Sequence, residues 1–232
     1  MSAPETRQLE KPSAFSLWLN GLPLLHLASG LGVAAGLCDT LAGWGTVLAI
    51  WIYLLPPLAS RLTILAWGRP EGRLTQDMTA YRIWWMLTQW QIIFNRLPWL
   101  EELLRLVPGL YALWIGLWGG NLSPYAYVGP MVLITDRHAI RVGRGAVLGM
   151  KSILAGHLVQ RDEAGRWLVL AAAPIVESEA ILGGAAQLGP GAVLRAGHIL
   201  PTGCRIHPFD EWPRRKEGVR NTGSDLPSQS LT

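Results

Sequence analysis

Aliphatic residues recur at every sixth position along the second half of the chain, in the series Val176, Leu182, Leu188, Leu194, Leu200 and Ile206. This spacing fits neither the 3.6-residue period of an α-helix nor the two-residue period of a half-exposed strand. It is typical of a solenoid, a chain that coils around an axis and turns one aliphatic side chain inward from each side of the coil. Small residues four places after the first three aliphatics predict corners with room for a short side chain: Ala180, Ala186 and Ala192.

The repeat extends towards the N-terminus with two interruptions. Val142, Leu148 and Leu154 keep the spacing, with Ala146 and Ser152 at the corner positions. Val128, Ile134 and Ile140 form an earlier set that is two residues out of phase with Val142. Residues 160–170 break the pattern and predict a polar turn around Gly165 followed by a return strand. We therefore expect a coil with one phase slip and one excursion.

This pattern resembles the hexapeptide-repeat acyltransferases over residues 121–208. The resemblance implies a left-handed parallel β-helix, assembly as a homotrimer, and a histidine acting as general base in a groove between subunits. It also implies a thioester donor, either acyl-coenzyme A (acyl-CoA) or an acyl-carrier protein. Copies of the same coil serve as spacers in other proteins, so the repeat predicts the fold more firmly than the chemistry.

The first half of the chain is apolar and rich in tryptophan. Half of all residues are hydrophobic, 16% are charged, and ten of the 12 tryptophans precede residue 120. Residues 15–37 and 41–58 are long enough to consider as membrane spans, since 18 helical residues reach about 27 Å and a hydrocarbon core is about 30 Å thick. A short polar turn at residues 38–40 joins them. His26, within the first segment, is interpreted as a helix-packing residue.

Basic residues lie outside both apolar segments (Arg7, Lys11, Arg61, Arg69 and Arg73), and Asp39 lies in the turn. By the positive-inside rule, both ends face the cytoplasm, which predicts an inner (cytoplasmic) membrane protein with its coil in the cytoplasm. A cleaved signal peptide is the first alternative, although a second apolar segment follows at once. A re-entrant hairpin is the second, because Pro23, Pro56 and Pro57 weaken straight helices.

Two further helices are expected before the coil. Residues 81–94 are rich in aromatic residues, which suits either a helix at the membrane interface or a buried helix that caps the coil. Residues 97–118 predict a second helix kinked at Pro108, and this segment also resembles a membrane-associated subgroup of the same acyltransferases.

The fold class is thus α+β. The predicted divisions are a polar tail (1–14), a membrane helical hairpin (15–67), amphipathic helices (68–120), a left-handed β-helix (121–208) and a disordered tail (209–232), whose basic cluster Arg214, Arg215 and Lys216 would touch lipid headgroups.

Three histidines are candidates for the general base. His157 is favoured because it lies beside the excursion, and Gly156 before it would let a substrate approach the backbone. Asp162 or Glu163 could orient its ring. Asp136 and His138 lie close together and form a second candidate pair, in which Asp136 could orient a base from a neighbouring turn. His198 replaces a small corner residue and must bulge outward or pack into a subunit interface.

The remaining predictions concern ligands. Lys151, Arg195 and Gly189 are candidate contacts for the donor, with solvated corner charges as the alternative for the first two. No metal is expected, since the histidine spacing of the related carbonic anhydrases is missing, and the charge of +4 is not clustered for nucleic acid. Cys38 and Cys204 do not suggest a disulfide framework. We predict acyl transfer to a hydroxyl or amine of a membrane-associated, lipid-linked acceptor; the alternative is a non-enzymatic trimeric membrane scaffold.

Overall fold

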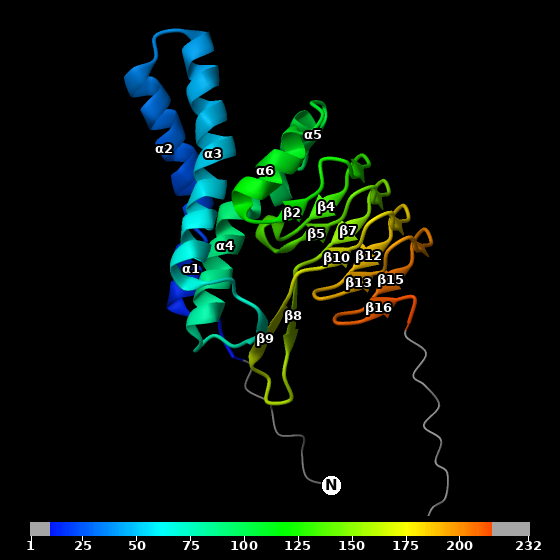
Figure 1. The fold of residues 1–232 in the computed structure, drawn as a ribbon. Coiled ribbons are helices and arrows are strands. Elements are labelled where there is room, and N and C mark those ends of the chain that lie inside the picture. Colours follow the sequence, from blue (N-terminus) through cyan, green and yellow to red (C-terminus); the bar gives the residue numbers. More distant parts are fainter. Residues whose placement is uncertain (1–9, 215–232) are drawn as a thin grey trace, which may run out of the picture.

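The computed structural model describes residues 10–214, so the predictions for Arg7, Arg215, Lys216 and the outer parts of both tails lie outside the described residues. Helices form one layer beside and over the first turn of a coil of strands (Figure 1). The helices are α1 (Ala14–Leu19), α2 (Leu22–Leu37), α3 (Leu41–Trp67), α4 (Thr79–Arg96), α5 (Trp99–Arg105) and α6 (Leu110–Trp118).

The coil is a parallel β-solenoid with three flat sides, each made of two-residue strands. The first side is a five-stranded sheet of β2 (Asn121–Leu122), β5 (Arg141–Val142), β10 (Ile175–Val176), β13 (Val193–Leu194) and β16 (Glu211–Trp212). The second contains β3 (Tyr127–Val128), β6 (Val147–Leu148), β11 (Ile181–Leu182) and β14 (Ile199–Leu200). The third contains β4 (Leu133–Ile134), β7 (Ile153–Leu154), β12 (Gln187–Leu188) and β15 (Arg205–Ile206). The six-residue period therefore predicted the coil correctly.

The interior of the solenoid follows the repeat. The six-spaced aliphatics are buried, apart from the half-buried Val128, and all but Ile140 are the second residues of their strands. Corner residues such as Ala180 and Ala186 are 0% exposed. Glycine follows several aliphatics because neighbouring turns approach closely there: a Cβ on Gly183 would lie 2.6 Å from the Leu200 carbonyl oxygen. Since β16 pairs with β13, the coil reaches Trp212, four residues beyond the predicted boundary at 208.

Both interruptions of the repeat are additions to the coil. The phase slip is a short 3₁₀ helix, η1 (Arg137–Ala139), inserted between β4 and β5. The excursion is an antiparallel hairpin of β8 (His157–Arg161) and β9 (Trp167–Ala171), as predicted. A third strand that the sequence did not indicate, β1 (Gly72–Leu74), extends this hairpin by pairing with β9.

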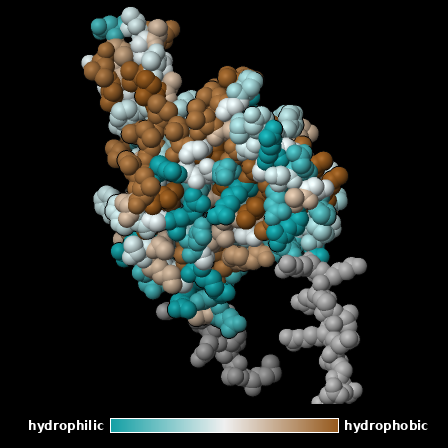
Figure 2. Space-filling model, viewed as in Figure 1, coloured by the Kyte–Doolittle hydropathy of each residue, from teal (hydrophilic) through white to brown (hydrophobic). Residues whose placement is uncertain are grey.

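Helices α2 and α3 form a hairpin whose surface is apolar and largely uncovered by the rest of the protein. They turn at residues 38–40, as expected, and His26 packs between the rings of Trp51 and Trp90. Figure 2 shows hydrophobic residues gathered over this hairpin. Two segments, residues 14–37 and α3, are long and apolar enough to cross a membrane, and only 17% and 22% of their most apolar windows are buried. Length and composition thus permit a membrane hairpin.

Helix α4 is a packing helix between the α2–α3 hairpin and the solenoid. Its Trp84, Leu87 and Phe94 are at most 2% exposed, which fits the buried alternative better than a helix lying on the membrane interface. The segment 97–118 forms two helices and not one kinked helix, which corrects the prediction. Gly109 has a left-handed φ of 77°, and this conformation ends any helical continuation from α5 into α6.

Candidate functional site

Asp136 and His157 meet at one corner of adjacent turns. Ile134 of β4 pairs with Leu154 of β7, so the residues that follow these strands, Asp136 and Gly156, lie side by side. The Asp136 Oδ2 atom is 2.7 Å from Nδ1 of His157 and 3.1 Å from the Gly156 backbone N–H that donates to it. The Thr135 hydroxyl also donates to Oδ2, at 2.6 Å. Three donors thus converge on one carboxylate oxygen.

Gly156 makes this approach possible. A Cβ at this position would lie 2.7 Å from the Asp136 Cβ and 2.9 Å from its Oδ2. The sequence had suggested that a substrate approaches the backbone here; the structure shows that the space is taken by the Asp136 carboxylate. Asp162, one of the two acids expected to orient His157, instead pairs with Arg166 in the β8–β9 turn, at 2.8 Å.

The electrostatics of the pair hold the acid ionised. Burial alone would raise the pKa of Asp136, which is 1% exposed, but the charge and hydrogen bond of His157 lower it to about 2. For His157, burial alone would lower the pKa, but the Asp136 charge and hydrogen bond raise it above its ordinary value. Because the carboxylate can only accept, Nδ1 carries the proton of the neutral imidazole and Nε2 keeps a free lone pair.

The His157 ring, 21% exposed, lies at the edge of a cleft of about 200 Å³ on the third side of the solenoid. Among the residues described, none hydrogen-bonds to Nε2. The cleft is also lined by Gly189, one of the predicted donor contacts, and by Arg205 and His207. On its other side the imidazole meets the ring of Trp84, edge to face, with ring centroids 5.1 Å apart. The ring is therefore fixed from two directions while one nitrogen stays available.

His138 is buried beneath this site and does not line the cleft. Its Nδ1 lies 3.2 Å from the Gln91 side-chain amide, whose oxygen accepts a hydrogen bond from the Arg137 backbone at 2.6 Å. Burial, opposed only in part by the charge of Asp136, lowers the pKa of His138 to about 4. Arg137 is 0% exposed and forms a buried ion pair with Glu101 of α5. These contacts anchor η1 to the helical layer and so position Asp136.

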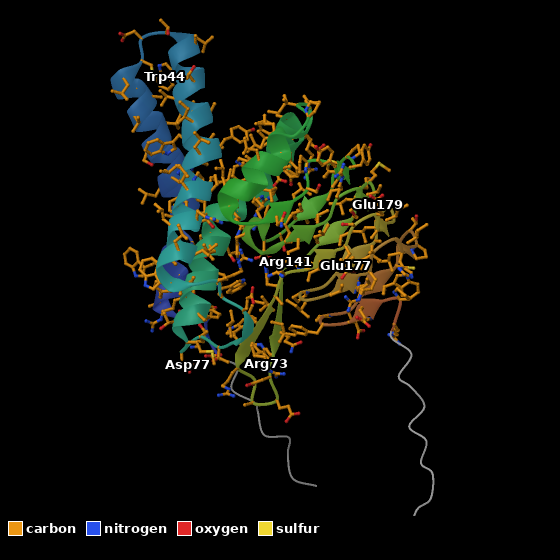
Figure 3. All side chains as sticks on the ribbon, in the orientation of Figure 1. Trp44, Arg73, Asp77, Arg141, Glu177 and Glu179 are labelled. Carbon is orange, nitrogen blue, oxygen red and sulfur yellow. The ribbon has the colours of Figure 1, made fainter. Side chains whose placement is uncertain are left out.

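The other predicted site residues lie elsewhere on the coil. His198 is exposed and bulges outward, with Nδ1 2.8 Å from the Ala196 carbonyl. Lys151 is exposed at a corner with a positive φ of 59°. Arg195 pairs with Glu177 and Glu211 on the first side of the coil, and Figure 3 shows Glu177 near Arg141 on that side. Their roles as donor contacts stay predictions. Within residues 10–214, no group of three His, Cys, Asp or Glu side chains is placed to hold a metal ion.

Sequence reasoning missed Thr135, Gln91 and Trp84. Thr135 directly precedes Asp136, and short hydroxyl residues commonly hydrogen-bond neighbouring groups, so it carried a local signal. Gln91 and Trp84 lie on α4, far away in sequence, and nothing local connects them to the coil. Gln91 is a polar residue within a helix rich in aromatic residues. Such a residue indicates a buried hydrogen-bond partner but does not show which residue that partner is.

Solved acetyltransferases resemble the chain at low similarity. A hexapeptide-repeat-containing acetyltransferase of Vibrio cholerae, complexed with acetyl coenzyme A, has a TM-score of 0.31 and 16% identity over 51% of this chain and 82% of its own. The serine acetyltransferase of Neisseria gonorrhoeae, in complex with serine, has a TM-score of 0.23 and 16% identity over 81% and 80%. No protein-family model and no curated protein sequence matches the chain. The assignment of a hexapeptide-type parallel β-solenoid accordingly comes from the strand pairing itself.

Proposed function

We propose that this protein is a membrane-anchored acyltransferase in which His157 is the general base and Asp136 its orienting acid. One observation carries the proposal. A buried, ionised carboxylate holds Nδ1 of His157 at 2.7 Å while the ring lines a cleft on the solenoid. An acid–imidazole pair of this kind activates a hydroxyl or amine for attack. Solvated surface histidines do not need a buried acid, so this geometry supports catalysis over a spacer role.

The reaction balances as a direct transfer. Nε2 of His157 removes the proton from the acceptor hydroxyl or amine as its oxygen or nitrogen attacks the thioester carbonyl carbon. Collapse of the tetrahedral intermediate breaks the carbon–sulfur bond. The imidazolium then returns its proton to the leaving thiolate. Asp136 stays ionised throughout and stabilises the transient positive charge on the ring.

The remaining parts of the proposal concern the membrane, the acceptor and the assembly, and the apolar surface of the α2–α3 hairpin supports the first of them. The apolar α2–α3 hairpin anchors the chain in the cytoplasmic membrane, which keeps the solenoid on the side where acyl-CoA or acyl-carrier-protein donors occur. The acceptor is then a hydroxyl or amine of a membrane-associated, lipid-linked molecule. A homotrimer would place a second copy against the cleft and complete the donor site, and Lys151 and Arg195 are proposed as further contacts for the donor along the coil.

The test is His157→Ala in the full-length chain purified in detergent. Turnover is measured as free thiol released from acyl-CoA in the presence of native membrane lipids, and assembly by size-exclusion chromatography with light scattering. We expect turnover to fall by about 10²- to 10⁴-fold at unchanged assembly. His198→Ala is the matched control and should keep full turnover. Equal turnover in wild type and His157→Ala would remove the proposed base and favour the scaffold alternative.

A further inference from the structure

A second cavity, partly open to solvent, lies between α1, α4 and the β8–β9 hairpin and has Trp84 in its wall. Its volume is about 290 Å³. Its walls are mainly aromatic and aliphatic, and include Leu17, Tyr81, Trp84, Trp85, Val159 and Trp167. A cavity that could hold several water-sized groups but offers them few polar partners is suited to an apolar ligand.

The cavity and the His157 ring share one wall. Trp84 is 2% exposed, lines the cavity, and has its ring centroid 5.1 Å from that of the imidazole. Val159 also lines the cavity and follows His157 by two residues on β8, about 6.6 Å along a strand. Side chains two residues apart on a strand point to the same face. A substrate bound at His157 therefore has the cavity within reach of a short apolar chain.

We propose that this cavity holds a medium-length acyl chain of the transferase substrate. The inference rests on the proposed function and makes its substrate class more specific. If a methylene needs about the volume of a water molecule, roughly 30 Å³, then 290 Å³ accommodates about ten carbons. An acetyl group would leave most of this space unfilled. The α1 wall lies at the base of the apolar hairpin, where chains of membrane-dissolved molecules are available.

The occupant can be tested without any turnover. A ten-carbon fatty acid carrying a terminal diazirine is photolysed with the full-length chain in detergent micelles, and labelled peptides are mapped by mass spectrometry. We expect the label in residues 81–85 and in the β8–β9 hairpin. Labelling confined to the outward faces of α2 and α3 would overturn the proposal, because it would show detergent-like contact with the hairpin alone.

Filling the cavity should remove this labelling. Val159→Trp displaces at least two methylenes, and each methylene returned to water costs about fourfold in affinity, so labelling should fall by more than about tenfold. Gln160→Trp, on the opposite face of the same strand, is the matched control and should label normally. Leu17→Trp narrows the cavity from α1 and provides a second variant should Val159→Trp fail to fold. Normal labelling in folded variants of both positions would overturn the proposal.

Competition identifies the molecule that carries the chain. Displacement of the label by decanoyl-CoA assigns the cavity to the donor, and displacement by a decanoyl lysophospholipid assigns it to a lipid acceptor. Displacement by neither, or equal displacement by acetyl-CoA, would overturn the proposal. His157→Ala should label like wild type, so loss of turnover in that variant tests the proposed function separately from the cavity.

Discussion

Replacing Asp136 with asparagine tests whether the buried acid works through the imidazole. The substitution Asp136→Asn keeps the size of the side chain but removes the charge that accepts from Nδ1 at 2.7 Å. A hydrogen bond to a charged group contributes about 1.5–3 kcal/mol. If that interaction strengthens as the ring becomes charged, kcat should fall by roughly 10- to 150-fold, since about 1.4 kcal/mol corresponds to a factor of ten.

The pH profile supplies the sharper readout. In wild type the Asp136 charge raises the pKa of His157, so the neutral base, and with it the rate, appears as the pH rises through that raised value. Without the charge, burial remains and lowers the pKa, so the midpoint of the profile should move to lower pH in Asp136→Asn. The assay is thiol release from acyl-CoA measured from pH 5 to pH 9.

The control for this experiment is Asp162→Asn. Asp162 is an acid near His157 in sequence, but it pairs with Arg166 and does not contact the ring. We expect its rate and midpoint to match wild type. A lower kcat in Asp136→Asn with an unmoved midpoint would refute the reasoning, because a merely structural acid would reduce the rate without changing the titration of the base.

Three further outcomes are expected. Gly156→Ala should lower turnover strongly and shift the pH midpoint down, because its Cβ would meet the Asp136 side chain at 2.7 Å; Gly184→Ala, whose nearest contact is 3.4 Å, is the control. Glu101→Gln should lower the free energy of unfolding by about 3–5 kcal/mol, since it leaves the Arg137 charge buried without its partner; denaturant titration measures this. Finally, the contribution of His138 to stability should fall by up to about 3 kcal/mol between pH 6.5 and pH 4, because the unfolded state protonates His138 while the folded state, with its pKa of about 4, does not. Denaturant titrations at these pH values give the free energy of unfolding, which should change less with pH in His138→Gln than in wild type. An equal change with pH in both proteins would contradict this assignment.

The sequence predicted the parts of the fold that repeat. In a coil with a six-residue period, the same position of every six-residue unit points inward. Leu182 and Leu188 could therefore be placed in the interior from their spacing alone. The predicted turn and return strand of the β8–β9 hairpin followed from Gly165 and the polar residues near it. Strand β1 could not be predicted, because its three residues, Gly72–Leu74, are too few to show a period and pair with β9 only once the helices have brought them there.

For the site, the sequence predicted the residues but not their arrangement. Asp136 and His157 were both candidates, and Asp136 was expected to orient a base from a neighbouring turn without that base being identified. The structure brings Asp136 to His157 through the β4–β7 ladder, while His138, which is as deeply buried as Asp136, contacts Gln91. Trp84 and Gln91 reach the site through packing of α4, and long-range packing leaves no local signature. The sequence shows only that a polar residue, Gln91, lies within a helix rich in aromatic residues.

The β4–β7 pairing makes the distance between acid and base a property of the backbone. Parallel neighbours in a sheet are separated by about 4.8 Å wherever they occur, so the pair inherits its spacing from the stacking of two turns. The hairpin that begins at His157 can then lengthen, shorten or change sequence beyond Arg161 without altering that spacing. The η1 insertion shows the same tolerance at the other corner, since Ile134 still pairs with Leu154 across it. Among homologues, variation in length should therefore accumulate in the hairpin tip, while the two paired strands keep their register.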